Sequence, residues 1–485
     1  RDAAGRGLSV VLCEKGDLAE GTSSRSGKYI HGGLRYLEYY EFRLVREALI
    51  EREVVLSVAP HLTRPLRLVL IHSPQQRPRW LIRLGLLLYD NLGGRKRIPA
   101  TKAVDLKRSA DGAMVRDTFT NAFAYYDVWV DDARLVILNA LDAARRGAEV
   151  LTRTACVSAR REDGLWRAVL RDTRTGEDRT VHARAIVNTA GPWVEEVLGN
   201  VAGVNTQKHV RLVKGSHIIN KRWWEGDHGY VLQARDKRLI FVNPYFDDLA
   251  LIGTTDIPYH DRPEDVAIDD DEITYLLEIL NDHFKISLTE ADVCDTYSGV
   301  RALFDDDSDK GASAVTRDYT FEVDGDVAAN GSGGRAPILS AFGGKITTYR
   351  KLSEHALEKF APAFPEMGGP WTAKAPLPGG DITEAIADFQ RALQARYSFL
   401  SAPLAHHYAI CYGREADTVL AGAKSLDDLG RHFGGLLYER EVRHLCTHEW
   451  AESADDILLR RTKHGLFLSK AETAALADWL EQADL

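Results

Sequence analysis

Three times along this chain, a short apolar segment that predicts a buried strand leads into a turn of glycines and small polar residues. The turns lie at residues 22–36 (TSSRSGKYIHGGLRY), 186–193 (IVNTAGPW) and 340–350 (SAFGGKITTYR). Glycine lets a backbone approach a ligand closely, and a helix that follows such a turn offers unpaired N–H groups and partial positive charge. Strands interleaved with helices in this way predict an α/β fold with a cofactor held at the turns.

The N-terminus favours the same interpretation. Residues 1–7 (RDAAGRG) predict the end of a helix and a turn, residues 8–13 (LSVVLC) a short buried strand, and Glu14 follows at its tip. In a dinucleotide-binding βαβ unit, an acidic residue at this place holds a ribose hydroxyl, and a glycine fingerprint precedes it by about 20 residues. We therefore expect that fingerprint upstream of Arg1 and interpret the chain as lacking its first strand and phosphate turn.

Length and composition limit the remaining choices. A chain of 485 residues exceeds the about 250–300 residues that one core supports, so several domains are expected. The net charge of −9 gives no indication of nucleic acid as a partner, and five cysteines without CxxC spacing argue against a zinc site or a disulfide framework. From about residue 381 the pattern becomes mainly helical after a PLPGG linker at 376–380, which predicts a separate C-terminal helical domain.

Several residues outside the turns could take part in catalysis or binding. Arg35, Arg301 and Arg317 stand beside glycines or hydroxyl residues, and the planar fork of arginine suits a phosphate group. His217 ends the segment KGSH, where we expect a histidine just after a glycine turn. Histidine is the side chain most readily used as a base near neutral pH, although a lone histidine is more often structural.

Two further features have simpler explanations. His444 and His448 lie four residues apart and could share a helix face, but no third ligand or HExxH pattern accompanies them, so the sequence predicts no metal site. Residues 77–97 (RPRWLIRLGLLLYDNLGGRKR) form an apolar stretch with basic flanks that is too short to span a bilayer. Either this stretch is a buried helix or it lies on an anionic lipid surface.

Taken together, the motifs resemble the aerobic FAD-dependent glycerol-3-phosphate dehydrogenase family over nearly the whole chain. The segments that carry the resemblance, in order, are 28–36 (KYIHGGLRY), 129–135 (WVDDARL), 188–193, 214–217, 253–256 (GTTD), 298–301 (SGVR) and 342–350 (FGGKITTYR). The resemblance implies an α/β + α protein: an FAD-binding, amino-acid-oxidase-like (Rossmann-type) domain, an interleaved substrate domain with an antiparallel sheet, and a C-terminal helical domain. The implied divisions are 1–65, 150–205 and 335–372 for FAD, 66–149 and 206–334 for the cap, and 373–485 for the helical domain.

The resemblance also implies roles for individual residues. The implied catalytic residues are His217, the candidate base, with Arg301 and Lys345. The implied substrate contacts are Arg35, Tyr36, Arg301, Arg317 and Lys345. The implied flavin contacts are Glu14, Thr22, Ser23, Ser24, Lys28, His31, Gly32, Gly33, Asn188, Ala190, Gly191, Gly343, Gly344, Lys345 and Thr347. Because the expected glycine fingerprint lies outside this chain, we expect the printed chain alone to hold FAD weakly.

The implied reaction is oxidation of sn-glycerol 3-phosphate to dihydroxyacetone phosphate, with electrons passed to a membrane quinone from the cytoplasmic face of the inner or plasma membrane. Two alternatives stay open. One is an oxidase that uses the same site and passes electrons to dioxygen, and the other is a flavin-free, membrane-associated binding protein. A soluble cytoplasmic pool and a homodimer are also compatible with the sequence.

Overall fold

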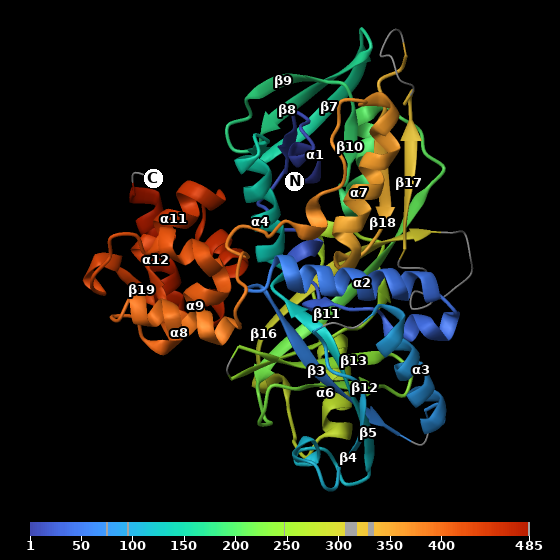
Figure 1. The fold of residues 1–485 in the computed structure, drawn as a ribbon, viewed down its shortest axis with the longest axis vertical. Helices are drawn as coiled ribbons and strands as arrows, with labels where there is room; N and C mark the ends of the chain where they lie inside the picture. Colours follow the sequence, from blue (N-terminus) through green and yellow to red (C-terminus); the bar gives the residue numbers. More distant parts are fainter. Residues whose placement is uncertain (74–75, 95–96, 247, 306–317, 328–333, 484–485) are drawn as a thin grey trace.

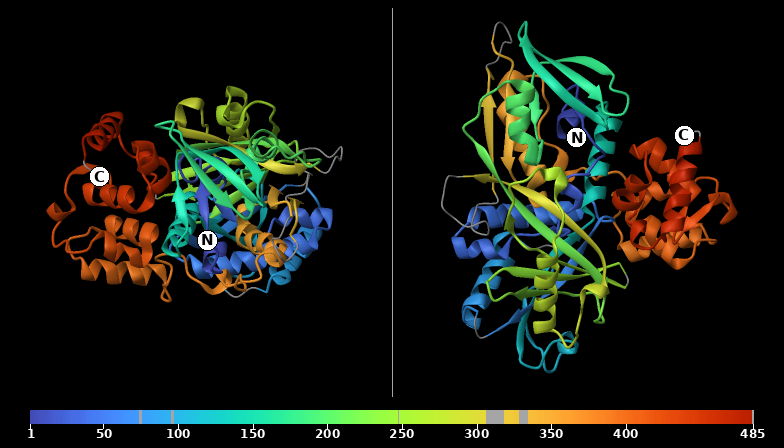
Figure 2. Two further views of the ribbon diagram at one scale, coloured as in Figure 1. Left: turned by 90° about the horizontal axis from the view of Figure 1, so that it is seen from above. Right: turned by 180° about the vertical axis from the view of Figure 1, so that it is seen from behind.

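The computed structural model describes residues 1–73, 76–94, 97–246, 248–305, 318–327 and 334–483. Figure 1 shows three parts: an α/β part with the N-terminus, a part built on a large sheet, and a helical part at the C-terminus. Both views in Figure 2 show the helical part set to one side of the other two. The chain crosses between the first two parts several times before it enters the helical part.

The α/β part contains short parallel strand pairs covered by helices. Strand β1 pairs in parallel with β6, and β10 pairs in parallel with β18, which also pairs with β17. A separate antiparallel sheet has the order β7-β8-β9. The strands are β1 (Val11–Cys13), β6 (Glu149–Leu151), β7 (Thr154–Glu162), β8 (Leu165–Asp172), β9 (Asp178–Ala183), β10 (Ile186–Asn188), β17 (Tyr319–Asp324) and β18 (Ile338–Gly343). The helices are α1 (Asp2–Gly5), α4 (Asp132–Arg145), α5 (Val194–Glu196) and α7 (Tyr349–Phe360). Parallel strands covered by helices are typical of dinucleotide-binding folds.

The second part is a ten-stranded, mainly antiparallel sheet. Its order is β15-β11-β14-β13-β12-β3-β5-β2, with β16 on β11 and β4 on β5. The strands are β2 (Tyr29–Ile30), β3 (Thr63–His72), β4 (Lys102–Asp105), β5 (Asn121–Val130), β11 (His209–Lys221), β12 (Gly229–Gln233), β13 (Leu239–Tyr245), β14 (Leu249–Gly253), β15 (Ile257–Pro258) and β16 (Val293–Asp305). Helix α6 (Asp270–His283) shares one hydrophobic core with this sheet, and α2 (Phe42–Val58) and α3 (Arg79–Leu92) share another.

The motifs KGSH and SGVR do not lie in turns. Lys214 and His217 belong to the middle of β11, and Arg301 belongs to β16, which pairs with β11 in antiparallel register. The expectation of a histidine after a glycine turn is therefore wrong. Gly215 and Gly299 lie opposite each other in this strand pair, where small residues leave room above the sheet.

Helix α4 differs from the predicted domain division. Residues 66–149 were assigned to the cap, but α4 packs with β6 and α1 of the α/β part. Ile137 and Ala140 of α4 share a hydrophobic cluster with Leu18 and Val150, so burial of this apolar face fixes the helix on the first part. Strands β3 to β5 do join the large sheet.

The helical part begins after a tight connection. Leu377 in the predicted linker is buried, and its amide donates to the Val58 carbonyl at 2.8 Å, so the PLPGG segment packs against α2. Among the described residues, five α-helices follow, α8 (Ile386–Arg396), α9 (Ala402–Tyr412), α10 (Ala416–Val419), α11 (Glu439–Glu449) and α12 (Lys470–Gln482), with the short strands β19 (His432–Gly434) and β20 (Leu437–Tyr438). These elements enclose a hydrophobic core of their own.

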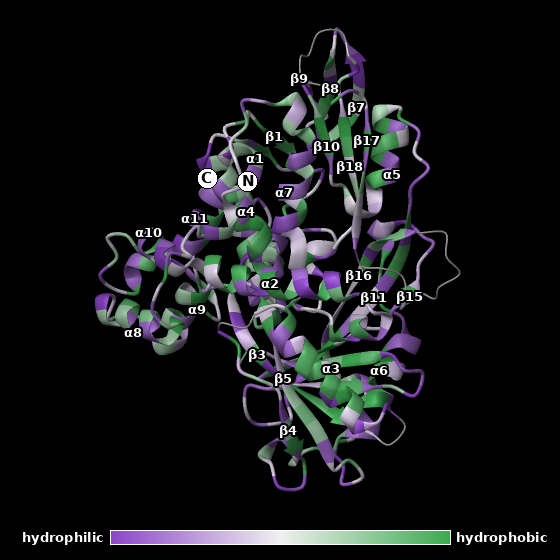
Figure 3. Cartoon of the chain, turned by 45° about the vertical axis from the view of Figure 1, so that its right-hand side comes forward, coloured by the Kyte–Doolittle hydropathy of each residue, from purple (hydrophilic) through white to green (hydrophobic). Residues whose placement is uncertain are grey.

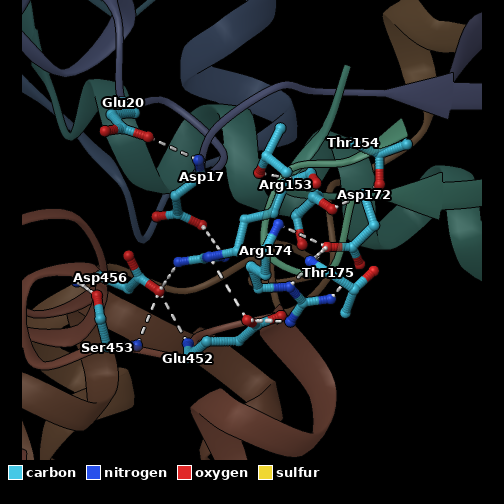
Figure 4. A network of polar contacts seen from close by, with 12 residues as sticks. Asp17, Glu20, Arg153, Thr154, Asp172, Arg174, Thr175, Glu452, Ser453 and Asp456 are labelled. Carbon is cyan, nitrogen blue, oxygen red and sulfur yellow. Dashed lines mark hydrogen bonds and ion pairs between the residues drawn. The ribbon is translucent and has the colours of Figure 1, made fainter. Parts of the chain in front are cut away.

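Buried charges join the helical part to the α/β part. Asp17, which follows β1, accepts from Arg460 Nε at 2.5 Å and from Arg461 Nη2 at 2.9 Å. Arg153, between β6 and β7, pairs with Asp456 of the helical part, as Figure 4 shows. Because the carboxylates and guanidinium groups compensate each other, this contact can exclude water without leaving isolated charges.

No helix in the described ranges is long and apolar enough to cross a lipid bilayer.

Candidate active site

A cavity of about 1420 Å³ lies where the α/β part meets the large sheet. Its walls combine the strand pair β11 and β16 with the turn after β18 and the loop that leads from η1 (Thr22–Ser24) to η2 (Leu34–Tyr39). Helix α3 forms part of the wall. All three turns that the sequence singled out contribute lining residues, so the fold brings them to one place.

His217 lies in this cavity under tight packing. Its ring stacks on Tyr297 of β16, with centroids 4.7 Å apart and planes at 21°. Gly253 lies directly opposite on β14, where an added Cβ would be 2.2 Å from His217 Cδ2. The imidazole is therefore held between a glycine on one side and an aromatic ring on the other.

The electrostatics keep His217 neutral. Burial, followed by the positive charges of Arg301 and Lys28, holds the pKa of this histidine well below 6.5. Its Nδ1 is buried without a hydrogen-bond partner among the described residues. A neutral imidazole can accept a proton, so His217 has the protonation state that a general base requires at neutral pH.

Arg301 lies on the same face of the sheet and is fixed by the GTTD segment. Its Nη1 pairs with Asp256, and its Nη2 donates to Thr254 Oγ1 at 2.7 Å. Gly215 makes this possible, because an added Cβ there would lie 2.7 Å from Arg301 Nη2. The side chain of Arg301 is 28% exposed, so the guanidinium is oriented by its partners while part of it remains accessible.

A second group of cationic residues comes from the glycine pair and from the turn after β18. Arg35 lines the cavity and makes no hydrogen bond or ion pair with residues that the structure describes. Lys345 Nζ lies 4.7 Å from the centre of the Tyr36 ring, and both residues also line the cavity. Gly33 has a φ of 74°, a left-handed conformation that glycine adopts at little cost. Cations from three separate elements thus surround one space.

The turn after β18 and the loop after β2 are joined to each other. The amide of His31 donates to Thr347 Oγ1 at 3.1 Å, and Thr347 Oγ1 donates back to the His31 carbonyl at 3.3 Å. Gly343 and Gly344 have φ values of 77° and 95°, and both line the cavity with His31. The hydroxyl of Thr347 is buried and acts through these backbone bonds.

Several predicted contacts support the cavity from behind instead of lining it. Lys28 is buried, and its ammonium donates to Asp132 at 2.8 Å and to the Ser24 carbonyl at 2.7 Å. Asn188 donates to the Val194 carbonyl at 2.9 Å and so shapes the turn before Gly191. The residues predicted as contacts that do not line the cavity are Glu14, Ser24, Lys28, Gly32, Asn188, Ala190 and Thr347. Arg317 lies outside the described residues.

Glu14 and Gly32 have identifiable structural partners. Glu14 Oε1 accepts from the Gly16 amide at 3.0 Å, and burial raises the pKa of the Glu14 carboxyl. Gly32 donates its amide to Tyr89 Oη at 2.8 Å, and an added Cβ there would collide with Tyr89 and Leu49. This glycine therefore allows α2 and α3 to pack closely under the loop. Thr22 lines the cavity with Ser23, and its hydroxyl donates to the Val300 carbonyl at 2.6 Å.

Sequence reasoning missed four residues of this site. Thr254 and Asp256 orient Arg301, and Tyr297 stacks on His217. Tyr29, whose hydroxyl donates to Asn243 Oδ1, also lines the cavity. Thr254 and Asp256 belong to the motif GTTD, and Tyr29 belongs to KYIHGGLRY. Membership in these motifs was the available signal, because a strand end or a paired strand can place such side chains beside Arg301 and His217.

Comparison with known proteins identifies the family. Residues 1–350 match the family model described as FAD dependent oxidoreductase, and residues 370–482 match the model described as the C-terminal domain of alpha-glycerophosphate oxidase. The chain belongs to the FAD-dependent oxidoreductase family. The predicted fold class is confirmed, and FAD is the cofactor of this flavoprotein dehydrogenase.

Individual relatives resemble this family member over nearly its full length. It is 57% identical over 486 residues to a D-erythritol 1-phosphate dehydrogenase of Brucella abortus, covering 100% of this chain and 95% of that one. It is 50% identical to a glycerol-3-phosphate dehydrogenase of Pseudomonas aeruginosa (99% and 92% covered) and 47% identical to the aerobic glycerol-3-phosphate dehydrogenase of Escherichia coli (99% and 94% covered). The crystal structure of a glycerol-3-phosphate dehydrogenase from Bacillus halodurans complexed with FAD superposes with a TM-score of 0.76 at 24% identity, covering 99% and 90% of the two chains.

The cavity of this flavoprotein fits a flavin dinucleotide in two respects. Gly191 lines it with a φ of 56°, and a Cβ added there would meet nothing within 4 Å, so the backbone at this turn borders open space in the cavity. Gly343 and Gly344 present a second stretch of glycine backbone to the same space. Both turns place backbone where a planar ring or a phosphate can approach closely.

Proposed function

We propose that this flavoprotein oxidises sn-glycerol 3-phosphate to dihydroxyacetone phosphate. The observation that carries the proposal is a neutral His217 beside an oriented Arg301 in a cavity that also contains Arg35. An alcohol oxidation needs a proton acceptor at the oxygen, and a phosphorylated substrate needs a fixed cationic clamp that aligns the reacting carbon. Relatives named glycerol-3-phosphate dehydrogenase at 47% and 50% identity support this substrate.

The proposed roles follow from position. Bound FAD supplies the acceptor for the hydride that leaves the secondary carbon. His217 accepts the proton of the substrate hydroxyl, while Arg35, Arg301 and Lys345 hold the phosphate, with Tyr36 beside them. A phosphate dianion near Arg301 offsets the positive charge that lowers the pKa of His217, so substrate binding strengthens the base. We also assign the turns 189–191 and 343–347 and the hydroxyls of Thr22 and Ser23 to FAD.

A second candidate substrate is D-erythritol 1-phosphate. The relative named for that substrate is 57% identical, a higher identity than that of the two glycerol-3-phosphate dehydrogenases named above. Both substrates carry a phosphate at one end and a secondary alcohol, and the erythritol ester is longer by one CHOH unit. The same base and clamp serve either molecule, so the choice depends on the space beyond the reacting carbon.

Anaerobic bleaching of the bound flavin decides between the substrates. Protein loaded with FAD is mixed with glycerol 3-phosphate, D-erythritol 1-phosphate or unphosphorylated glycerol, and kcat/KM is then measured with an artificial electron acceptor. We expect glycerol 3-phosphate to bleach the flavin and to give the highest kcat/KM of the three compounds. Unphosphorylated glycerol should not bleach the flavin. A higher kcat/KM for the erythritol ester would transfer the assignment to the second candidate, and bleaching by glycerol at equal efficiency would contradict the phosphate clamp.

We further propose that electrons pass to a membrane quinone and that α3 rests on the lipid surface. Leu86 and Tyr89 of α3 are buried against the large sheet. The opposite face exposes Trp80 (68%), Leu84, Leu87 and Leu88, and α3 is largely coloured as hydrophobic in Figure 3. Leu84 and Leu88 also line the cavity, so an apolar acceptor could enter from the membrane side. These observations support the interfacial interpretation of residues 77–97. Attachment at the cytoplasmic face of the inner or plasma membrane and a homodimer stay predictions.

Pelleting with anionic vesicles tests the attachment. Trp80 and Leu87 are exposed and lie outside the cavity lining, so Trp80→Ser with Leu87→Ser changes the surface alone. We expect this variant to stay in the supernatant, whereas Leu426→Ser, a matched exposed leucine in the helical part, pellets like the parent protein. Arg79→Gln with Arg83→Gln should weaken binding by about 1 kcal/mol per charge at low salt. Arg95 and Lys96 of the predicted basic flank lie outside the described residues. Unchanged pelleting of both α3 variants would refute attachment through α3.

The electron acceptor has its own test. With glycerol 3-phosphate present, reduction of a short-chain quinone is compared with hydrogen peroxide production in air. Quinone reduction far above peroxide yield supports the dehydrogenase, and stoichiometric peroxide would show the oxidase alternative instead. The flavin-free alternative is set aside because the chain belongs to an FAD-dependent family.

A further inference from the structure

The helical part contains a buried cluster of three metal-ligating side chains. They are His407 of α9, Glu441 of α11 and His464 of η14 (His464–Leu466). One ring nitrogen of each histidine and one carboxylate oxygen of Glu441 lie within 4.8 Å of one another. The three residues are 6%, 0% and 4% exposed. None of them lines the active-site cavity, so catalysis does not account for the cluster.

The hydrogen bonds within this cluster leave two polar atoms without partners. His407 Nε2 lies 2.7 Å from Glu441 Oε1, which also accepts from Tyr412 Oη at 2.7 Å. Glu441 Oε2 and His464 Nε2 are buried, and neither has a hydrogen-bond partner among the described residues. A buried carboxylate oxygen and a buried imidazole nitrogen are costly when unpaired, so a pair of His407 and Glu441 alone does not explain the arrangement.

We propose that His407, Glu441 and His464 bind one divalent transition-metal ion, and that the ion is zinc. Two imidazole nitrogens and one carboxylate oxygen form a ligand set that zinc accepts in a tetrahedral site. Bonds of about 2.0–2.1 Å place neighbouring ligand atoms about 3.3 Å apart in that geometry. His407 Nε2 and Glu441 Oε1, which are 2.7 Å apart, therefore separate slightly on binding. A water molecule takes the fourth position.

The neighbourhood of the cluster fixes the orientation of one ligand ring. On the other side of the His407 ring, Nδ1 lies 3.6 Å from Cys411 Sγ, a contact that orients the ring so that Nε2 faces Glu441.

The site ties three elements of the helical part together next to its contact with the α/β part. Lys463, the residue before His464, pairs with Asp131, and Glu449 at the end of α11 pairs with Arg134. Both partners belong to the start of α4 or its cap. A metal ion bound by residues 407, 441 and 464 would thus fix the positions of Lys463 and Glu449, which contact α4 and its cap. The proposed role of the metal is therefore structural.

Metal analysis of the full-length, FAD-loaded protein tests the proposal. The protein carries no histidine tag, is dialysed against zinc and then against buffer, and its metal content is determined by mass spectrometry. We expect about one zinc per chain, falling at least tenfold in Glu441→Gln and in His464→Gln. The matched control is His444→Gln with His448→Gln, because these rings stack with centroids 4.6 Å apart on the same helix as Glu441 but belong to no described cluster of three ligands. This control should retain the zinc.

A second readout makes the result independent of folding defects. Cobalt substituted for zinc should give the visible d–d bands of a tetrahedral site in the parent protein and in the control, with the bands lost in Glu441→Gln. Bound FAD, measured in each sample, shows that the α/β part is folded, and far-UV circular dichroism shows whether the helices of the helical part are retained. A flavin-loaded parent protein that retains no zinc or cobalt, or variants that retain as much as the parent, would overturn the proposal and leave a buried His–Glu ion pair.

Discussion

Replacing Gly253 by alanine would move the proposed base without removing it. Gly253 ends β14 and lies opposite His217 on β11. The added Cβ would be 2.2 Å from His217 Cδ2, whereas carbon atoms in contact prefer about 3.5–4.0 Å, so the ring must shift by about 1.3 Å. Tyr297 stacks on the ring at 4.7 Å from the other strand, which prevents a simple retreat. The imidazole must therefore tilt or leave its position in the cavity.

The expected loss can be estimated from this displacement. A misplacement of about 1 Å in a positioned catalytic group can lower the rate about 10²-fold. We expect the rate of flavin reduction by saturating substrate to fall by about that factor in Gly253→Ala, with little change in the substrate concentration that gives half the maximal rate. Overpacking also costs about 1–3 kcal/mol of stability, so thermal unfolding is measured on the same samples.

Anaerobic stopped-flow measurement of flavin bleaching is the suitable assay, because it reports the chemical step without the electron acceptor. Rates are normalised to bound FAD. Gly199→Ala is the matched control, since a Cβ at Gly199 meets nothing within 4 Å and the residue does not line the cavity. A flavin-replete Gly253→Ala protein that bleaches at the control rate would refute the reasoning that His217 must hold its position.

Three further substitutions test the site and the domain contact. His217→Ala should lower kcat about 10²–10⁴-fold in flavin-replete enzyme and abolish the acid limb of the pH profile; an unchanged kcat would exclude this base. Arg301→Gln should raise KM for the phosphorylated substrate. Because loss of this positive charge allows the pKa of His217 to rise towards 6.5, the acid limb of the kcat/KM profile should move to higher pH. An acid limb that stays in place or moves to lower pH would contradict this. Asp17→Ala leaves the buried Arg460 and Arg461 without their shared carboxylate, so urea unfolding should show a loss of about 3–5 kcal/mol, and an unchanged midpoint would disprove this role.

The sequence predicts short buried elements well when one apolar run fills one element. The apolar run LALIG at 249–253 forms strand β14, and the apolar residues Leu44, Val45, Ala48 and Leu49, which stand at helical spacing, lie in α2. The sequence fails on β11 and β16, the two 13-residue strands that carry the site. Gly215 suggested a turn, but in the sheet it makes room for Arg301, and Gly299 opposite it makes room for Arg25. Glycines that serve side-chain packing across strands cannot be distinguished from turn glycines without the pairing register.

The sequence motifs could predict which segments form the site but not the role of each residue in it. His217, Arg301 and Lys345 meet in one cavity, which the motifs by themselves did not show. Lys28 and Thr347 come from the same motifs yet act through buried partners, Asp132 and the backbone of His31. Nothing in residue type separates a lysine that faces a ligand from a lysine that neutralises a buried carboxylate, because that difference depends on a contact with a residue about a hundred positions away.

The two acidic residues of the WVDDARL segment show why a motif can be informative without lining the cavity. Asp131 caps α4 by accepting from a backbone amide and also pairs with Lys463 of the helical part. Its neighbour Asp132 accepts from Lys28 Nζ at 2.8 Å and from Ser26 Oγ at 2.7 Å, both in the loop that leads to the glycine pair. Carboxylates are favoured at the N-terminus of a helix, so the start of α4 can carry both Asp131 and Asp132. A shift of the helical part at Lys463 would therefore act on the same turn that fixes the cofactor loop, which physically couples the docking of the helical part to the shape of the active site.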